Sequence, residues 1–520
     1  MLRAVALTFT CAVLALTAAA CGQSSSGGDA DPATLVPANA AVYAEASVRP
    51  EGELRDDALA AAGKILRTDD PAGRLRELID EGLAEDAGGL TWEKDFAPWL
   101  GERVGFWADN LEREEPSFAA IAATTDTEAA RSAIQKFKQQ DAGEYTKRSH
   151  AGVDYEVNAD GTAAAIIDDF LVVGSEDAFK RTAELAEDGE ALADADRYRN
   201  AIDDLEEDRL GQFFFDSKVI MQAASEEDPA SAEALKQFES ALPFDKLGPV
   251  VGSVQADREG MAVDSISTGV PEGPLRTFST LFGGANSELM PDLPGDAWGA
   301  FAMPKVGESS KQLFSAFAGA IGGAAAAAQF KQATGLDLEQ DVFSWIGDAG
   351  VFVRGTSEAE INGALVIQST DDDKAAAAFG KIIGLIGKEA GIRPEPVQIE
   401  GAESAFSLAV PDAPQAIVLA RSAGRVVAAY GEEAAKAGLD PDAKLADSPL
   451  YGDAKDAFDD GVEPALLLSM PSIVELVDAL GQADADWDKA KPYLKSINAI
   501  TSGGKLDGDT VTSRIAITFK

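Results

Sequence analysis

The sequence predicts an α+β fold with two tandem copies of one domain, each an antiparallel sheet with helices packed mainly on one face. Three observations predict this fold. Two sequence blocks recur at a spacing of about 250 residues, which is too long for a solenoid unit and fits two copies of a domain. Short strand-like runs are joined by tight turns, which indicates antiparallel hairpins. Helix start signals lie between these runs, and this mixture is typical of the α+β class.

The N-terminus has the pattern of a secretory signal. Residues 1–3 are a short positive segment, and residues 4–20 are uncharged and rich in Ala, Leu and Val. Small residues then precede Cys21, and this segment resembles the lipobox of bacterial lipoproteins. The resemblance implies that Cys21 receives a diacylglycerol thioether and becomes the new N-terminus. A plain cleaved signal and an uncleaved membrane helix, with Cys21 incidental, are the alternatives.

The positions of the cysteines fit lipidation. Cys11 lies in the discarded segment, so the mature chain keeps one cysteine, and acyl chains give that residue a physical use. Residues 23–29 are polar and small, as in a flexible linker. We therefore expect a lipoprotein signal peptide at residues 1–20 and a lipidated cysteine with a flexible tether at residues 21–33. The expected location is extracytoplasmic, at the cell membrane and lipid-anchored.

Two blocks carry the internal repeat. Residues 89–101 align with residues 335–347 without a gap, and six of the thirteen positions are identical. Residues 192–198, which contain Leu-Ala-Asp and a later Tyr, match residues 445–451 in the same order. The structural repeat positions that we take from the first block are Asp95, Trp99 and Gly101 in the first copy, and Asp341, Trp345 and Gly347 in the second.

Proline and glycine concentrate between the two copies and mark the domain boundary. Residues 270–274 read Val-Pro-Glu-Gly-Pro, and residues 283–287 read Gly-Gly-Ala-Asn-Ser. We expect the first α+β repeat at residues 34–270, a linker at residues 271–288 and the second α+β repeat at residues 289–520. Copies of this length are near the upper end of the usual domain range.

The first copy contains several runs with the composition of strands. These runs are residues 41–48, 104–108, 118–124, 170–173 and 212–215. Tight turns are expected at Asp160–Gly161 and Asp168–Asp169, and in the second copy at Asp507–Gly508. Turns of this kind connect neighbouring antiparallel strands.

Capping residues and prolines mark the starts of helices. Residues 70–71, Asp-Pro, suit a cap followed by proline at the first helical position, and apolar residues then follow on one helix face. Residues 125–128, Thr-Asp-Thr-Glu, form a capping-box pattern that opens a helix over residues 129–137. Residues 448–449, Ser-Pro, mark another helix start.

Several short blocks resemble a known family. They are the opening at residues 36–43, the Trp-Leu-Gly-Glu block at residues 99–102 and the later Leu-Ala-Asp and Tyr block. On these blocks the chain resembles a family of uncharacterised bacterial lipoproteins of the actinobacterial type, known only as a domain of unknown function and present here as a tandem duplication. The resemblance covers most of residues 31–520. It implies no catalytic residues, because none are established for the family.

The charge balance excludes some partners. The chain has 44 Lys and Arg against 89 Asp and Glu, which gives a net charge of −45. Such a field repels nucleic acid, so no nucleic-acid partner is expected, and divalent cations are expected only as weak screening. One histidine and two cysteines are too few for the usual zinc sites or for a disulfide framework. We expect no metal site and no cofactor.

The motifs that could carry chemistry have simpler interpretations. A Ser-His-Asp triad would need His150, the single histidine, which lies in the polar stretch 147–152 that we interpret as an exposed turn before a strand. Residues 156–161 carry oxygen-bearing side chains at alternate positions, as in a calcium loop, but Ile167 stands where a bidentate glutamate is required. A hairpin turn explains this segment better. We assign no catalytic residue.

The many carboxylates leave one enzymatic alternative. Glycoside hydrolysis needs two carboxylates that flank the scissile bond, and the repeat offers Glu102 with Asp348 and Asp95 with Asp341. The other interpretation is that these acids cap or turn the chain beside a core tryptophan. We favour this structural role, and a carboxylate-dependent hydrolase acting on cell-wall glycans is the alternative function.

The apolar stretch at residues 313–330 could be a membrane span, a buried helix or part of a binding groove. Residues 313–330 are uncharged, have the length of a membrane span and include a Gly-x-x-x-Gly packing motif. Alanine and glycine make this stretch only weakly hydrophobic, so a helix buried against the sheet is preferred. Its small residues are alternatively the floor of a groove for an acyl chain or a partner helix.

The function that these features predict is binding. We expect a non-catalytic protein of the cell envelope, held at the membrane by its N-terminal lipid, that binds an envelope protein or a lipid ligand. This expectation depends on the missing site chemistry together with the anchor and the repeat.

Overall fold

The described chain contains helices and large antiparallel sheets, which confirms the predicted α+β class. The computed structural model describes residues 29–86, 89–109, 117–140, 143–219, 243, 246–320, 323–389, 393–411, 413–458, 461–481 and 485–520. The predicted signal peptide and Cys21 lie outside these residues. The chain divides into two compact units, unit 1 (Met1–Leu235 and Phe244–Gly269) and unit 2 (Lys236–Pro243 and Val270–Lys520).

Unit 1 contains an open antiparallel sheet. Its strands are β1 (Val42–Ser47), β2 (Leu100–Asp109), β3 (Ser117–Thr124), β4 (Tyr145–His150), β5 (Val153–Asn158), β6 (Thr162–Ile167), β7 (Phe170–Ser175), β8 (Gly211–Phe215), β9 (Val250–Ala256) and β10 (Gly260–Ser267). Their order across the sheet is β10, β9, β8, β1, β2, β3, β7, β6, β5, β4. Strand β4 therefore ends this order, with β5 as its neighbour.

Unit 2 contains a sheet with the same strand order. Its strands are β11 (Gly299–Met303), β12 (Ile346–Arg354), β13 (Asn362–Ser369), β14 (Glu395–Pro396), β15 (Ser404–Leu408), β16 (Ile417–Ser422), β17 (Arg425–Tyr430), β18 (Pro464–Ser469), β19 (Ile497–Asp507) and β20 (Thr510–Phe519). Their order is β20, β19, β18, β11, β12, β13, β17, β16, β15, β14. Strand β14 of unit 2 thus corresponds to β4 of unit 1.

A shared hydrogen bond aligns the two sheets residue by residue. Thr125 directly follows β3 and donates its N–H to the carbonyl of Trp99 over 2.7 Å. Thr370 directly follows β13 and donates its N–H to the carbonyl of Trp345 over 2.8 Å. Because both threonines make the same bond to the repeated tryptophan, β3 and β13 can be matched position by position.

The strand register extends this alignment from β3 and β13 to the outer strands β4 and β14. One row across unit 1 is Ala120, Val173, Ala164, Glu156 and Lys147. The matching row in unit 2 is Leu365, Ala428, Leu419, Phe406 and Pro396. The register of a sheet determines which face each side chain lies on. Residues at the same position in the two rows are therefore structurally equivalent. Lys147 is therefore equivalent to Pro396, and Glu156 to Phe406.

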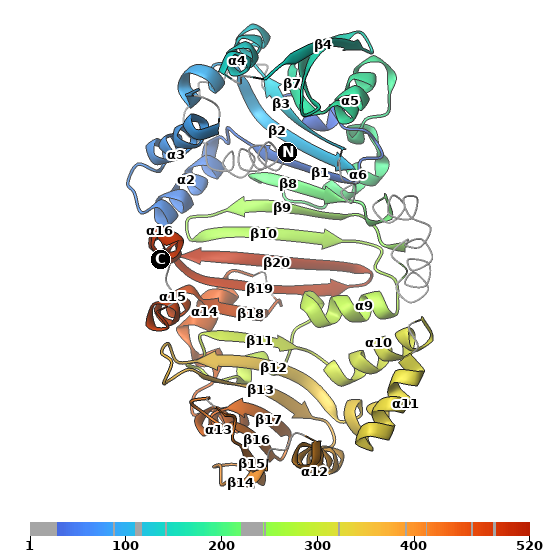
Figure 1. Ribbon diagram of the computed structural model, residues 1–520, viewed down its shortest axis with the longest axis vertical. Coiled ribbons are helices and arrows are strands. Elements are labelled where there is room, and N and C mark those ends of the chain that lie inside the picture. The colour runs from blue at the N-terminus through green and yellow to red at the C-terminus, as the bar shows by residue number, and fades with distance from the viewer. Residues whose placement is uncertain are drawn as a thin grey trace. The chain divides into compact units, whose positions relative to one another are not determined.

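Helices connect the strands and flank the outer part of each sheet (Figure 1). Those of unit 1 are η1 (Pro32–Leu35), α2 (Gly52–Leu66), α3 (Pro71–Asp86), η2 (Trp92–Phe96), α4 (Thr127–Gln140), α5 (Glu176–Asp188), η3 (Leu192–Asp194) and α6 (Asp196–Ile202). Those of unit 2 are α9 (Pro274–Ser279), η5 (Thr280–Gly284), η6 (Met290–Asp292), α10 (Val306–Ala320), α11 (Gly323–Thr334), η7 (Leu338–Phe343), α12 (Asp372–Glu389), α13 (Glu432–Leu439), η8 (Leu445–Asp447), α14 (Pro449–Asp456), α15 (Met470–Ala479) and α16 (Ala485–Leu494). The segment expected to be the linker therefore contains α9 and η5.

The helix starts follow the capping residues, with one correction. The Asp70 side chain accepts the N–H of Gly73 over 2.9 Å, so α3 begins at the proline as predicted. The cap of α4 is Asp126 rather than Thr125, because the Asp126 carboxylate accepts the N–H of Ala129 over 3.0 Å. The Thr125 hydroxyl instead donates to the carbonyl of Trp99 over 3.2 Å, which makes it unavailable as the cap.

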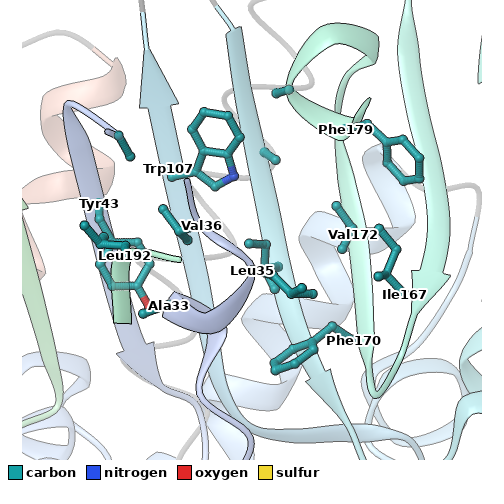
Figure 2. Packing of buried hydrophobic residues seen from close by; sticks show 14 of the residues in the cluster. Ala33, Leu35, Val36, Tyr43, Trp107, Ile167, Phe170, Val172, Phe179 and Leu192 are labelled. Atoms are coloured by element: carbon teal, nitrogen blue, oxygen red, sulfur yellow. The ribbon is translucent and has the colours of Figure 1, made fainter. Parts of the chain in front are cut away.

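The outer strands of unit 1 pack against helices on both faces. On one face Ile167, Val172 and Phe179 are buried together, so β6 and β7 pack against α5 (Figure 2). Alternation along the strands places Ile166 and Leu171 on the opposite face. There they pack in a second cluster with alanines of α4. The two helices therefore cover opposite faces of the same strands.

The core of unit 2 has the same arrangement. Val366, Val427 and Ala434 are buried in one cluster, which joins β13 and β17 to α13. Trp345 and Ala378 are buried in another cluster, which joins the start of β12 to α12. Figure 1 shows α12 and α13 beside the outer strands β14 to β17.

The apolar stretch at residues 313–330 does not form one buried helix, so that prediction is wrong. The stretch is divided between α10, which ends at Ala320, and α11, which begins at Gly323. Ala325 and Ala328 are exposed. An alanine side chain gains little free energy from burial, so a run of alanines does not compel burial. No helix in the described part of the chain is long and apolar enough to cross a membrane.

The polar stretch before Val153 is a strand and not a turn, which corrects a second prediction. Residues Tyr145–His150 form β4, and the turn is Ala151 and Gly152, whose φ angles are 47° and 73°. Two consecutive residues with positive φ give a two-residue hairpin turn that fits the twist of the flanking strands. Polar side chains on both faces of β4 hid the alternation that identifies strands.

Candidate functional site

The repeated aspartate and tryptophan of unit 1 form a hydrogen-bonded turn. The Asp95 carboxylate accepts the N–H of Thr91 over 2.9 Å and the ammonium of Lys136 over 2.7 Å. Its carbonyl accepts the indole N–H of Trp99 over 2.5 Å. Burial acts to raise the pKa of Asp95, but the Lys136 ammonium and the Thr91 N–H outweigh burial and hold this pKa below its ordinary value.

The same turn occurs in unit 2. The Asp341 carboxylate accepts the N–H of Asp337 over 2.8 Å and lies 3.2 Å from the ammonium of Lys381. The indole of Trp345 donates to the carbonyl of Asp341 over 3.0 Å. The Asp337 N–H, followed by the Lys381 ammonium, holds the pKa of Asp341 below its ordinary value. In both units the aspartate stabilises a turn beside a buried tryptophan, as the sequence predicts.

The repeated glycines lie where a strand changes register. Gly101 is buried, within the part of β2 where the pairing with β3 shifts. Gly347 lies within the corresponding shift between β12 and β13. A Cβ at Gly347 would lie 3.2 Å from the side chain of Thr370, so a larger residue would crowd the start of α12.

The acids that follow these glycines have different surroundings. The buried Asp348 carboxylate accepts the hydroxyl of Ser287 over 2.7 Å and the N–H groups of Glu288 and Lys305 over 2.8 and 2.9 Å. Glu102 is half-buried, and burial together with nearby carboxylates raises its pKa. Asp348 therefore fastens the main chain of unit 2, while Glu102 has no such role among its described contacts.

These contacts account for three of the four acids proposed as hydrolytic pairs. Asp95 and Asp341 each accept a main-chain N–H from their own turn, and Asp348 accepts one from a distant segment of the chain. Each pair also has one member in unit 1 and one in unit 2. The structure brings together Asp95 with Trp99 and Asp341 with Trp345, and it does not join either hydrolytic pair within one unit.

A second candidate site is a groove in unit 1 between α4 and the strands β4 to β6, which we call the α4 groove. Its volume is about 1220 Å³, somewhat larger than the roughly 300–1,000 Å³ of typical ligand pockets. Figure 1 shows α4 and β4 at the same end of unit 1. The lining residues that matter below are Arg131, Ile134 and Lys138 from α4, Lys147 from β4, Glu156 from β5 and Ile166 from β6.

Charged side chains of both signs line the α4 groove. Lys138 forms an ion pair with Glu156, and the ammonium of Lys147 lies 3.9 Å from the same carboxylate. One carboxylate thus serves two ammonium groups. Burial lowers the pKa of Lys138, and the charge of Lys147 lowers it further. Asp154, Asp168 and Glu187 also line the groove, so its positive side chains are balanced by carboxylates.

The neighbouring Arg148 points to the other face of the sheet. It forms an ion pair with Glu176 of α5, which also accepts the hydroxyl of Tyr155 over 2.8 Å and the ammonium of Lys180 over 2.9 Å. These donors, Lys180 first, lower the pKa of Glu176 to about 2 even though burial acts to raise it. The charge of Arg148 is therefore matched within unit 1.

His150 ends β4 and contacts α5. Its Nε2 lies 2.7 Å from a carboxylate oxygen of Glu184. This contact fastens the end of the hairpin to the helix. His150 lies in a strand and has a partner, whereas the sequence predicts a residue in an exposed turn.

Two aromatic side chains meet at the equivalent place in unit 2. In each unit a lysine of the helix forms an ion pair with the repeated aspartate, and this shared contact aligns α4 with α12. In the alignment Ile134 corresponds to Phe379, and Lys138 corresponds to Ile383. The rings of Phe379 and Phe406 lie 6.2 Å apart, within the range of aromatic contacts. Phe406 is the equivalent of Glu156, so an aromatic pair replaces the charged groups of the α4 groove.

The α4 groove was missed from the sequence because β4 reads as a turn. Two signals could have found it. Ala151 and Gly152 separate two six-residue runs, which is a hairpin spacing. The second copy has the sequence Pro394-Glu-Pro396, whereas the corresponding run in the first copy contains no proline. This difference indicates that the two copies differ in structure at this place.

The described ranges offer no metal centre. Among them, no group of three or more His, Cys, Asp or Glu lies close enough to hold an ion. Residues 156–161 end β5 and turn into β6, where the Asn158 side chain accepts the N–H groups of Asp160 and Thr162 over 3.1 and 2.9 Å. The segment is a hairpin turn whose amide side chain is occupied by the main chain.

Comparison with known proteins identifies a family but no activity. A family model described as "Protein of unknown function (DUF3352)" matches residues 2–503. No curated protein matches the chain. Of the solved structures, "Structure of crystal form IV of TP0453" is 13% identical and covers 46% of this chain and 80% of that chain, with a TM-score of 0.25. "Structure of crystal form III of TP0453" is 13% identical and covers 50% and 90%, with a TM-score of 0.26. Scores this low carry no argument about function.

The repeated turn predicts that Asp95 has a structural role. We expect Asp95→Ala to lower the free energy of unfolding of unit 1 by about 1–3 kcal/mol, because it leaves the partly buried N–H of Thr91 and the ammonium of Lys136 without their acceptor. Urea unfolding measures the change. The matched control is Glu93→Ala, which removes an exposed carboxylate two positions away and should change stability by less than about 0.5 kcal/mol. Equal losses in the two variants would contradict the assigned role.

The ion-pair cluster at Glu176 predicts a pH-dependent loss of stability. Its pKa is about 2 when folded, against an ordinary value of 4.5, so its stabilising effect is present above pH 4.5 and is lost as pH falls toward 2. At neutral pH, Glu176→Gln should lower the free energy of unfolding by about 1–2 kcal/mol after allowance for solvent screening. The difference from the parent protein should shrink toward zero at pH 2. Glu187→Gln, at an exposed position of the same helix, is the control and should show no such pH dependence.

Proposed function

The chain belongs to the DUF3352 family of proteins of unknown function, and from its own residues we propose that it is a secreted, lipid-anchored protein of the cell envelope. In this proposal it acts by binding a partner and performs no catalysis. The binding site is the α4 groove of unit 1. Each part of the proposal has separate support.

The anchor is supported by the N-terminal sequence. Small residues precede Cys21, which is the only cysteine after the signal segment, and a polar stretch follows it. Acyl chains on such a cysteine hold a protein at a bilayer without a membrane-spanning helix. Among the described residues no helix is long and apolar enough to cross a membrane.

The difference between the two units is the observation that carries the binding function. Both units keep the same strand order, register and repeated turn, and in unit 1 this place is a groove lined by charged side chains that include Lys138, Glu156 and Lys147. In unit 2 the rings of Phe379 and Phe406 make contact at the equivalent place. A polar groove contributes less to stability than a packed aromatic pair, because charged groups lose hydration there. Its presence in unit 1 therefore favours a role in binding.

The absence of catalysis in this proposal is supported by the roles of the acids. Asp95, Asp341 and Asp348 bind main-chain N–H groups, and a carboxylate with these partners is a poor candidate for acid or base catalysis. The proposal also takes the two units as copies of one ancestral domain. The shared strand order, the shared register and the repeated turn support a tandem duplication.

Lipidation predicts the behaviour of Cys21→Ala. Cells that express the parent protein and are fed an alkyne analogue of palmitate should incorporate the label into it, and the variant should incorporate none. The parent should fractionate with membranes and the variant should not, because a single acyl set is the anchor. Variant protein that still carries the label would contradict lipidation at Cys21.

Binding in the α4 groove predicts a position-dependent crosslink in cells. The photoreactive residue p-benzoylphenylalanine is placed at Gln135, an exposed lining residue of the groove, or at the equivalent Gly380 of unit 2, also exposed. Irradiation should give a discrete adduct from position 135 and little from position 380, because the proposed binding site is the unit 1 groove and the unit 2 position has an aromatic pair. Equal adducts at both positions, or none at position 135, would contradict the groove as the binding site.

A further inference from the structure

One face of the unit 2 sheet is apolar across the strands from β20 to β15. Two neighbouring rows of side chains lie on this face, and we call them together the unit 2 apolar face. The first row is Ile515, Ser502, Leu466, Phe301, Val351, Leu365, Ala428, Leu419 and Phe406. The second row lies two residues along each strand, and so on the same face, and is Ile517, Ile500, Leu468, Gly299, Val353, Gly363, Tyr430, Ile417 and Leu408. None of these residues is charged.

The centre of the unit 2 apolar face is uncovered. The exposed fractions are 41% for Val351, 39% for Leu365 and 50% for Ile515. On the opposite face of the same strands, Phe352 and Ala364 are buried in a cluster that includes residues of α13. Contiguous apolar surface that stays exposed is typical of a binding surface.

The equivalent places in unit 1 are less exposed. Leu365 is equivalent to Ala120, and their partners on the next strand are Val351 and Phe106. Ala120 and Phe106 are only partly exposed, and the ring of Phe106 stacks on Phe118 at 6.2 Å. The exposed apolar surface is therefore a property of unit 2 and not of the shared strand order.

Segment η5 borders the unit 2 apolar face on one side. Gly504 of β19 lies two residues from Ser502 and so on the same face. A Cβ at Gly504 would clash with the carbonyl oxygen of Gly283, so η5 packs directly on this face. Beside this contact Phe278 of α9 and Phe282 of η5 are exposed, with ring centroids 4.7 Å apart. Two further apolar side chains thus adjoin the face.

Helix α12 borders the unit 2 apolar face on another side. Ile367 lies two residues from Leu365, and it packs against Trp345 and buried alanines of α12. Arg421 lies two residues beyond the first row on β16, and it forms an ion pair with Glu403 at 2.6 Å. The charge nearest to the rows along this strand is therefore matched.

The unit 2 apolar face selects a ligand without charge or hydrogen-bonding groups. The strands between β20 and β15 each pair with a neighbour on both sides, so their N–H and C=O groups bond within the sheet. The polar side chains of the two rows are Ser502 and Tyr430, and the Tyr430 hydroxyl accepts the N–H of Gln415 over 3.3 Å. A polar group placed on this face would lose hydration without gaining a partner, whereas a hydrocarbon chain is stabilised by leaving water.

The size of the face and the charge of the chain favour an acyl chain over a second copy. The row from Ile515 to Leu365 crosses from β20 to β13, and five strand spacings of about 4.8 Å give about 24 Å. An acyl chain spans one leaflet, about half of the roughly 30 Å hydrocarbon core of a bilayer, and so fits within this length. A second copy would bring together two chains of net charge −45, which repel each other.

We propose that the unit 2 apolar face binds an acyl chain of a membrane lipid, which lies across β20 to β13 beside Phe278 and Phe282. This inference goes beyond the proposed function, because it concerns unit 2 and does not require the α4 groove. Burial of apolar surface supplies the affinity. The proposed N-terminal anchor holds the protein at a bilayer, which is the source of the chain.

The first arm of the test varies the lipid. The full-length protein is mixed with phosphatidylcholine vesicles that contain a small fraction of phosphatidylcholine with a diazirine near the end of one acyl chain. Irradiation, proteolysis and mass spectrometry should place adducts on peptides that contain Val351, Leu365 or Phe282. A matched lipid with the diazirine in its headgroup should label these peptides at least about tenfold less, because the polar headgroup has no partner on this face.

The second arm varies the protein. Leu365→Glu places a carboxylate at the exposed centre of the face and should lower acyl-chain labelling at least about tenfold. Ile515→Glu does the same from β20 and provides an independent variant if the first does not fold. Leu480→Glu changes an exposed leucine at the end of α15, outside both rows, and is the control with unchanged labelling expected. Circular dichroism establishes that each variant is folded.

The outcomes separate this inference from the proposed function. No adduct on the unit 2 apolar face, equal labelling by the two lipids, or unchanged labelling of the folded Glu variants would each overturn acyl-chain binding. Sedimentation velocity tests the other occupant, because a parent dimer that Leu365→Glu converts to a monomer would assign the face to a second copy and overturn the lipid. The cellular crosslink at position 135 reports the α4 groove separately, so either site can fail without the other.

Discussion

The position of α4 depends on one buried carboxylate. Asp95 accepts a main-chain N–H from its own turn and the ammonium of Lys136 from α4, so a single side chain fastens the helix to the turn. A buried carboxylate that lost these partners would be strongly destabilising, which makes this contact hard to vary. Trp99 packs against alanines of α4 beside it. The α4 groove exists because the helix is held here while β4 to β6 form the opposite wall.

Unit 2 uses the same constraint with a different result. Asp341 and Lys381 hold α12 as Asp95 and Lys136 hold α4. The side chains that face the outer strands then differ, since Phe379 is aromatic where Ile134 is aliphatic. A backbone framework whose register is fixed can therefore carry either a packed apolar contact or a charged groove. The difference between the units lies in side chains and in the length of the edge strand.

The sequence predicts the framework better than the site. Local patterns suffice for a cap such as Asp70 and for the turn around Trp99, because their partners are close in sequence. The α4 groove depends on contacts that join separate elements, such as Lys138 on α4 with Glu156 on β5, and no local pattern specifies them. Strand β4 was also hidden, since its exposed polar side chains lack the alternation by which strands are recognised.

The prolines of β14 have a consequence for aggregation. Strand β14 lies at the end of the strand order of unit 2, and positions 394 and 396 are prolines. Proline has no N–H to donate, so a strand from another molecule cannot form a regular hydrogen-bonded pair along this edge. The two prolines therefore protect the outer edge of unit 2 against edge-to-edge association of sheets.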